Sequence, residues 1–310
     1  MKSQKFIHRK FVAMILMRTI RYLQKRPTLM DISFLDHTDK FTVCGDTHGQ
    51  FYDLLNIFKI NGDPSSKNPY LFNGDFVDRG SFSVEVILTL FMYQLLHPTG
   101  MYLTRGNHET KNMNKLYGFE GEVKHKFDDK IMALFAEAFQ WLPLCAVIEK
   151  KVFVVCIFLS LSLCVCLCVC VCFFFSICLP LHYTPRQQQQ QQLQQVHGGI
   201  FTQDNVTLDD IRKIKRNGEP PESGPFCDML WSDPSPRPGR HPSKRGVSSK
   251  EFGEDVTKAF LKHNNLDLVV RSHEVKQEGY EVMHDGKCVT IFSAPNYCGT
   301  LHFFSIFPLS

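Results

Sequence analysis

The sequence predicts an α/β fold built on a βαβαβ core with parallel strands. Between residues 40 and 110, short apolar segments alternate with longer segments of helical periodicity. In chain order the expected elements are a strand at 41–46, a helix at 51–60, a strand at 69–75, a helix at 83–96 and a strand at 101–107. This alternation is typical of right-handed βαβ units. Each strand ends in polar residues, at the edge of the sheet where ligands bind.

Local patterns support each of these elements. The three strand segments are short and apolar, and each ends at a glycine followed by an acid or an amide. Both helical segments carry apolar residues at three- and four-residue spacing, which places them on one face of a helix. In the longer helix these residues are Val84, Ile87, Leu88, Phe91 and Leu95.

The N-terminal segment, residues 1–39, is expected to be a helix and a linker. It is basic, and Phe11, Met14 and Ile15 have the spacing of an amphipathic helix whose apolar face packs on a core or docks on a partner. Arginines follow this apolar run directly and no small-residue cleavage site is present, so a signal peptide is not expected.

Composition limits the classes of function. The chain has 310 residues and a net charge of +4, and 21% of its residues are charged. Lysine and arginine are scattered beyond the N-terminus, which gives nucleic-acid binding little support. Most of the 12 cysteines lie within residues 155–195, and the others are dispersed, which fits reduced thiols in the cytoplasm or the nucleus. These others are Cys44, Cys145, Cys227, Cys288 and Cys298.

The residues at the three strand ends have the chemistry of a metal site. Asp46 and His48 are two apart, so on an extended backbone both side chains point the same way. Asp75 and Asn107 arrive from the next two strand ends. Carboxylate, imidazole and amide donors suit two divalent ions such as Mn, Fe or Zn. Two such ions, about 3.5–4 Å apart, can share a hydroxide that attacks at neutral pH.

The motifs together resemble those of the phosphoprotein phosphatase family of metal-dependent serine/threonine phosphatases. The resemblance covers residues 40–154 and 196–298, and it implies a two-sheet αββα sandwich of the metallophosphoesterase type. The motifs that carry it are GDTHG (45–49), GDFVDRG (74–80), GNHE (106–109), HGGIF (197–201), LWSDP (230–234), KRGVS (244–248), RSHE (271–274) and SAPNYC (293–298).

This resemblance implies a complete set of site residues, with Asp75 bridging two metal ions. They are Asp46, His48 and Asp75 for the first ion; Asp75, Asn107, His197 and His273 for the second; His108 as the general acid with Asp78 orienting it; and Arg79, Asn107, Arg245 and Tyr297 for the phosphate. The implied reaction is hydrolysis of phosphoserine or phosphothreonine by in-line attack of a metal-bridging hydroxide. No Cys-x5-Arg spacing occurs in the chain, which excludes the cysteine-nucleophile class of phosphatase.

Two other functions remain as alternatives. Asp-x-His together with Gly-Asn-His also occurs in metallophosphoesterases that are nucleases or phosphodiesterases. The later motifs favour the protein phosphatases, and no basic-aromatic stripe suggests a nucleic-acid channel. An inactive fragment is the second alternative, because residues 155–195 interrupt the family pattern and its C-terminal strands are missing. Phosphoproteins are the expected partners, and a membrane is expected only if residues 155–195 are a genuine insertion.

At both ends the chain is expected to differ from its family. The resemblance stops at Cys298, so residues 299–310 are expected to be an atypical tail of a truncated domain with an open sheet edge. Some members of the family carry an N-terminal tetratricopeptide module. The residues before the first expected strand are too few for such an array, so chaperone docking through it is not expected.

Residues 155–195 interrupt the catalytic domain expected over 40–298. Residues 152–185 contain no charged residue, a length that could cross a bilayer, and a glutamine-rich run follows. Alternating cysteines of a strand would point to opposite faces, so a disulfide framework is not expected. Without residues 155–195 the chain reads KKVFVVHGGIF, a continuous apolar strand that ends at His197. The repetitive texture is what a dinucleotide repeat and a pyrimidine tract give on translation. We expect a translated intron, with a genuine membrane or hairpin insertion as the alternative.

Overall fold

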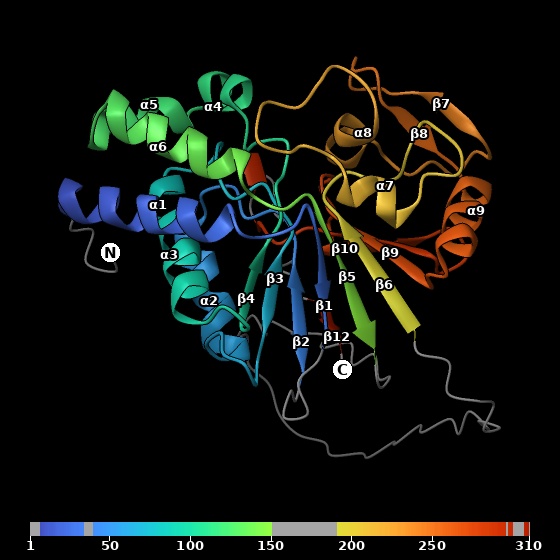
Figure 1. Cartoon of the computed structure of the whole chain (residues 1–310), viewed down its shortest axis with the longest axis horizontal. Coiled ribbons are helices and arrows are strands. Elements are labelled where there is room, and N and C mark those ends of the chain that lie inside the picture. Colours follow the sequence, from blue (N-terminus) through green and yellow to red (C-terminus); the bar gives the residue numbers. More distant parts are fainter. Residues whose placement is uncertain (1–6, 34–39, 151–190, 296, 300–306, 310) are drawn as a thin grey trace, which may run out of the picture.

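The computed structural model describes residues 7–33, 40–150, 191–295, 297–299 and 307–309 of the chain. Two large sheets, a two-stranded hairpin and two groups of helices make up this part (Figure 1). The six-stranded sheet has the order β1 (Leu29–Ile32), β5 (Cys145–Lys150), β6 (Gln191–Val196), β9 (Leu268–Arg271), β11 (Cys288–Ile291), β10 (Tyr280–Met283). The four-stranded sheet has the order β12 (Phe307–Leu309), β2 (Phe41–Cys44), β3 (Tyr70–Phe72), β4 (Met101–Leu103). A small hairpin pairs β7 (Arg240–Pro242) with β8 (Lys250–Phe252).

The two sheets pack face to face, and the alternation of side chains along each strand shows it. In β3, Leu71 belongs to a buried cluster shared by both sheets, whereas Tyr70 and Phe72 belong to the cluster on the helix side. In β11, Val289 and Ile291 join the shared cluster in the same way. Because successive residues of a strand point to opposite faces, strands such as β3 and β11 contribute to two apolar layers at once.

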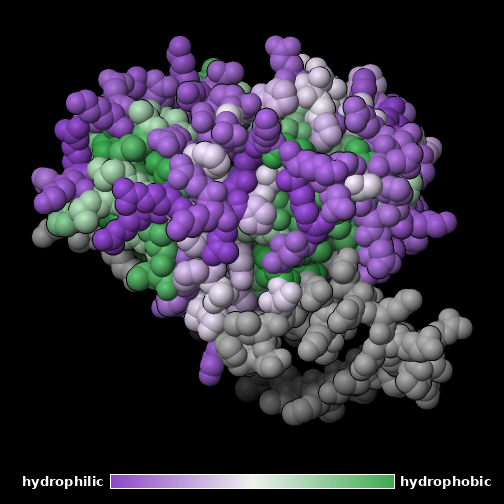
Figure 2. Space-filling view, in the orientation of Figure 1, coloured by the Kyte–Doolittle hydropathy of each residue, from purple (hydrophilic) through white to green (hydrophobic). Residues whose placement is uncertain are grey.

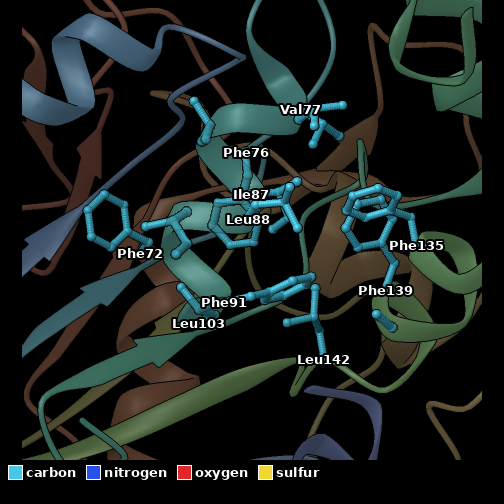
Figure 3. Close-up of a cluster of buried hydrophobic side chains, with 14 of the residues drawn as sticks. Phe72, Phe76, Val77, Ile87, Leu88, Phe91, Leu103, Phe135, Phe139 and Leu142 are labelled. Atoms are coloured by element: carbon cyan, nitrogen blue, oxygen red, sulfur yellow. The ribbon is translucent and has the colours of Figure 1, made fainter. Parts of the chain in front are cut away.

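Helices cover the outer face of the four-stranded sheet. They are α1 (Arg9–Leu23), α2 (Phe51–Asn61), α3 (Ser83–Leu96), α4 (Lys111–Tyr117), α5 (Phe119–Lys126) and α6 (Asp129–Gln140). Figure 3 shows the largest core cluster, in which Phe91 of α3 and Phe135 of α6 are fully buried together with Phe72 of β3. The face of the molecule shown in Figure 2 is mostly hydrophilic, with smaller apolar patches between the polar side chains.

A second group of helices covers the six-stranded sheet. These are α7 (Leu208–Arg212), α8 (Pro225–Trp231) and α9 (Glu254–Asn264), and Figure 1 shows them on the opposite side of the strands from α1 to α6. Val269 of β9 and Phe260 of α9 lie in the cluster between this group and the sheet. The predicted αββα sandwich is therefore confirmed. The predicted core is confirmed too, because β2, β3 and β4 are parallel neighbours joined by α2 and α3.

The N-terminal segment differs from the prediction in two ways. It contains the expected helix α1, but Phe11 is 55% exposed, and Val12, Leu16 and Ile20 form the buried face instead. The expected linker also contains a strand, because β1 pairs with β5 in parallel. The buried side chain of Arg216 donates to the carbonyl oxygens of Leu23 at 2.9 Å and Arg26 at 2.6 Å, which holds the carboxyl end of α1.

The C-terminal residues include one strand, and the expectation of an atypical tail stays a prediction. Residues 307–309 form β12, which pairs antiparallel with β2 and closes one edge of the four-stranded sheet. The six-stranded sheet ends at β10, where Val282 is 51% exposed. The edge strands are β1 and β10 in the six-stranded sheet and β12 and β4 in the four-stranded sheet.

Strand β6 includes the end of the glutamine-rich run. It lies between β5 and β9, and its register places Gln194 opposite Val147 and Val269. Both of these valines are buried. Residues 151–190, which hold most of the predicted insertion, lie outside the described residues, so the intron hypothesis stays a prediction. None of the helices described here is long and apolar enough to span a membrane.

Deleting residues 155–195 should stabilise the fold more than deleting residues 155–190. The longer deletion puts Val154, Phe153 and Val152 at the registers of Gln195, Gln194 and Leu193, whereas the shorter one retains the glutamines. A strand that is covered on both faces is normally apolar. We therefore expect a difference in the free energy of unfolding of about 2 kcal/mol or more, measured by urea denaturation. Equal free energies for the two variants would contradict this account of β6.

Candidate active site

The predicted site residues converge where strand ends of the two sheets meet. Asp46 follows β2 and forms an isolated parallel bridge with Phe292, which follows β11. The Ser293 N–H donates to the Asp46 carbonyl oxygen at 3.1 Å. Asp75 follows β3. Residues that follow β4, β6 and β9 complete the group: they are Asn107, His197 and His273.

Several site residues have left-handed backbone conformations, which residues other than glycine rarely adopt. The φ angles are 39° at His48, 49° at Asp75 and 75° at His273. Asp78 and Arg79 both have a φ of 69°. Such conformations persist only where the surrounding structure enforces them, and they concentrate at functional sites.

A first group of ligand atoms surrounds His48. Its Nδ1 donates to the Val77 carbonyl oxygen at 3.0 Å, so its Nε2 carries the free lone pair. This Nε2 lies 3.8 Å from Asp46 Oδ2 and 3.8 Å from Asp75 Oδ2. These distances are too long for hydrogen bonds. One ligand atom each of His48, Asp75 and His108 also lies within 4.8 Å of the others.

A second group contains Asp75, Asn107, His197 and His273. The Nε2 atom of His197 lies 3.3 Å from Asp75 Oδ1 and 3.0 Å from Asn107 Oδ1. Its Nδ1 donates to the Asn73 carbonyl oxygen at 2.6 Å. The Nε2 atom of His273 is buried and has no hydrogen-bond partner in the described part of the chain. Asp75 therefore faces the first group with one oxygen and the second with the other.

These donors fit two divalent cations. His48 and His197 each give the outer ring N–H to a backbone carbonyl, which is how metal-binding histidines are oriented. A buried nitrogen without a partner, such as His273 Nε2, requires an explanation that a bound ion would supply. Burial lowers the pKa of His48 to about 3, which keeps this imidazole neutral, as a ligand must be.

The charge balance around Asp75 also favours a cation. Burial and the neighbouring Asp75 raise the pKa of Asp46 to about 7, because two carboxylates share this buried space. Burial works against a charge on His197, but Asp75 outweighs it and raises the pKa of this imidazole to about 9. Positive charge is thus stabilised between these ligands, whether a proton or a metal ion supplies it.

His108 and Asp78 form a buried pair beside the two groups. The Nδ1 atom of His108 lies 2.8 Å from Asp78 Oδ2, and the Phe119 N–H donates to Asp78 Oδ1 at 2.9 Å. Burial opposes a charge on His108, but the carboxylates of Asp75 and Asp78 outweigh it and raise the pKa of the imidazole. This arrangement can hold a proton on the ring, which a general acid requires.

The predicted phosphate-binding residues border the same site. The guanidinium carbon of the exposed Arg79 lies 3.8 Å from the centre of the Tyr117 ring, a cation–π contact. The ring of Tyr297 lies 4.9 Å from that of His48. Arg245 reaches the site beside His273, whose carbonyl oxygen accepts from Arg245 Nη2 at 3.0 Å. Two cationic side chains are therefore available at the rim.

Sequence reasoning gave Asp233 and Arg271 no role, although both lie within quoted motifs. Asp233 accepts from Arg245 Nε at 2.5 Å and from Arg271 Nη2 at 2.8 Å. Burial opposes the charge of Asp233, but Arg271 outweighs it and holds the pKa of this carboxyl well below its usual value. Because Arg271 is fully buried, this ion pair fixes the position of Arg245.

Glu109 is a further residue without a predicted role. Its buried carboxylate accepts from the backbone N–H groups of Asp75 and Gly106, both at 2.8 Å, and of Phe76 at 2.9 Å. It thus ties the turns after β3 and β4 together. No residue with a side chain fits at position 106, because a Cβ atom on Gly106 would lie 2.3 Å from Asp75 Oδ1. The only signal in the sequence is the position of Glu109 next to His108.

Comparison with known proteins agrees with this site. Residues 39–277 match the family model of the calcineurin-like phosphoesterases. The chain is 56% identical over 297 residues to serine/threonine-protein phosphatase 5 of Homo sapiens, covering 96% of this chain and 51% of that protein. It is 49% identical to serine/threonine-protein phosphatase T of Trypanosoma brucei brucei, covering 54% of that protein.

A solved structure is similar as well. A serine/threonine phosphatase from Saccharomyces cerevisiae, described as similar to human phosphatase 5, matches with a TM-score of 0.80 at 37% identity. The match covers 96% of this chain and 81% of that one. The chain spans about half the length of the curated relatives it matches. The family match extends over most of the chain and includes the strand ends that carry Asp46, Asp75, Asn107, His197 and His273, so this chain belongs to the calcineurin-like phosphoesterase family.

Proposed function

We propose that this chain is a metal-dependent serine/threonine protein phosphatase, which hydrolyses phosphoserine and phosphothreonine monoesters. The observation that carries the proposal is the position of Asp75 between two groups of ligand atoms, with the His108–Asp78 pair beside them. The relatives named phosphatase 5 and phosphatase T support it, since they match nearly the whole of this chain.

Two divalent ions would be held at this site. Asp46, His48 and Asp75 are the proposed ligands of the first ion. The second would be held by Asp75, Asn107, His197 and His273. Bound there, the ions would supply Lewis-acid activation of water and charge neutralisation of the phosphate. The donor set suits Mn, Fe or Zn.

The remaining residues bind the substrate and move a proton. Arg79 and Arg245 bind the phosphate oxygens, and Asn107 and Tyr297 border the same space. Asp233 holds Arg245 through Nε and Nη2, so that Nη1 is left for the substrate. His108 donates a proton to the serine oxygen as the ester bond breaks, because a serine alkoxide is a poor leaving group. In balance, a phosphate monoester and water give an alcohol and inorganic phosphate.

We further propose that the substrates are phosphoproteins of the cytoplasm or the nucleus. Reduced thiols support this location, and Cys44, Cys145, Cys227 and Cys288 are all free and buried.

A phosphoserine peptide should be hydrolysed much faster than a phosphodiester such as bis(p-nitrophenyl) phosphate. Two arginines suit the dianion of a monoester, and a diester has one charged oxygen fewer to bind. Release of phosphate and of nitrophenol measures the two rates, with chelator-treated protein as the control. A preference for the diester would point to a nuclease or phosphodiesterase. No turnover by protein with two bound ions would show an inactive fragment.

Replacing Asp75 with Asn should weaken both metal sites. One carboxylate faces both groups of ligands, so its loss should leave fewer than two ions per chain in metal analysis and little activity. Asp46→Asn should affect mainly the first ion. Asp129→Asn serves as the control, because the side chain of Asp129 is 83% exposed and lies outside the site. An Asp75→Asn protein with two ions and full activity would contradict the bridging role.

Replacing His108 with Asn should spare metal binding and slow the reaction. The expected loss of kcat on a phosphoserine peptide is about 10²–10⁴-fold, the usual contribution of general acid catalysis. With an aryl phosphate the loss should be much smaller, because a phenolate leaves without a proton. Equal losses on both substrates would argue against His108 as the proton donor.

A further inference from the structure

Helix α4 lies directly beside the proposed proton donor and contributes one buried polar side chain. Asn114 is 1% exposed. Its Nδ2 atom lies 2.6 Å from the carbonyl oxygen of His108 and 3.2 Å from Asp78 Oδ2. The same carboxylate oxygen accepts from His108 Nδ1 at 2.8 Å. Asn114 thus contacts both members of the acid pair.

The chemistry of these two contacts fixes the orientation of the amide. A carbonyl oxygen and an ionised carboxylate oxygen only accept hydrogen bonds, so the amide nitrogen must face them. The nitrogen carries two protons, one for each acceptor. Asn114 Oδ1 is buried and has no hydrogen-bond partner among the described residues. The position of Asn114 is therefore set by what its nitrogen donates.

These two hydrogen bonds link the backbone and, through Asp78, the ring of His108 to one atom, Asn114 Nδ2. The backbone of His108 is held through its carbonyl oxygen, and its ring is held through the Asp78 oxygen that Asn114 also binds. Asp78 Oδ1 is fixed separately by the Phe119 N–H, just beyond α4. Rotation of the imidazole away from the ligand groups would break its hydrogen bond to Asp78 Oδ2, the oxygen that Asn114 holds in place.

We propose that Asn114 is a positioning residue for the proton donor. It holds Asp78 Oδ2 and the His108 backbone at a fixed spacing, so that the imidazole faces the leaving oxygen of the substrate. This inference rests on the proposed phosphatase function and on His108 as its acid. Serine or threonine could not replace the amide, because a hydroxyl group has one proton to give.

The test is the substitution Asn114→Leu, which keeps the approximate volume and removes both donors. We expect kcat on a phosphoserine peptide to fall about 10–100-fold, a part of the full general acid effect. On p-nitrophenyl phosphate the change should be less than about 3-fold, because this leaving group needs little protonation. Metal content should stay at the wild-type level. In the His108→Asn background the same substitution should cause no further loss, since it acts only through His108.

Leu116→Ala is the matched control, because Leu116 lies on the same helix and is 67% exposed. Equal losses on both substrates, or a further loss in the His108→Asn background, would overturn the proposal. If Asn114→Leu does not fold, Asn114→Ala removes the same donors without filling the site, and failure of both would show a structural role instead. Failure of the proposed function would be visible in the wild-type protein alone, because that protein would then be inactive on phosphopeptides.

Discussion

The arrangement of the site depends on a single buried carboxylate, that of Asp75. Its two oxygens face His48 and His197 on opposite sides, and Oδ1 accepts the backbone N–H of His108 at 2.9 Å. A charge of this kind is costly to bury unless its surroundings compensate it. The imidazoles, the metal ions that we propose, and the backbone N–H of His108 provide that compensation. Strand ends from both sheets must therefore meet within a few ångströms of Asp75.

The convergence of strand ends around Asp75 introduces locally destabilising features near the site. His48, Asp75 and His273 have left-handed backbones, and His273 Nε2 and Asn114 Oδ1 are buried without hydrogen-bond partners among the described residues. Each such feature destabilises the folded state and so lowers the free energy of unfolding. The compensation lies elsewhere, in the apolar layer between the sheets and in the two layers beneath the helices. The stabilising apolar contacts of the sandwich therefore lie beside the site and not within it.

The sequence predicted the parts of this structure that follow from local periodicity. The strands that precede Asp46, Asp75 and Asn107 are apolar runs that end at a glycine, and the structure has them where they were expected. Periodicity predicted the helix α1 but not which of its residues meet the core: Ile15 packs against the core, whereas Phe11 is exposed. Glu109 and Asn114 had no predicted role for a different reason. Glu109 accepts from backbone N–H groups after β3 and β4, and Asn114 donates to the His108 carbonyl oxygen and to the Asp78 carboxylate. No spacing rule in the sequence encodes hydrogen bonds of this kind.

Strand β6 shows how far geometry and stability can separate. His197 needs a strand between β5 and β9 to carry it to the site, and the ladder of that strand is made by backbone groups that every residue but proline possesses. Glutamines can therefore pair with β5 and β9 and deliver His197 next to Asp75. Glutamine is polar, whereas the residues opposite Gln194 in the register, Val147 and Val269, are apolar and buried. Backbone hydrogen bonds can thus carry the His197 imidazole to the site, whereas we expect an apolar sequence in β6 to make the sheet more stable.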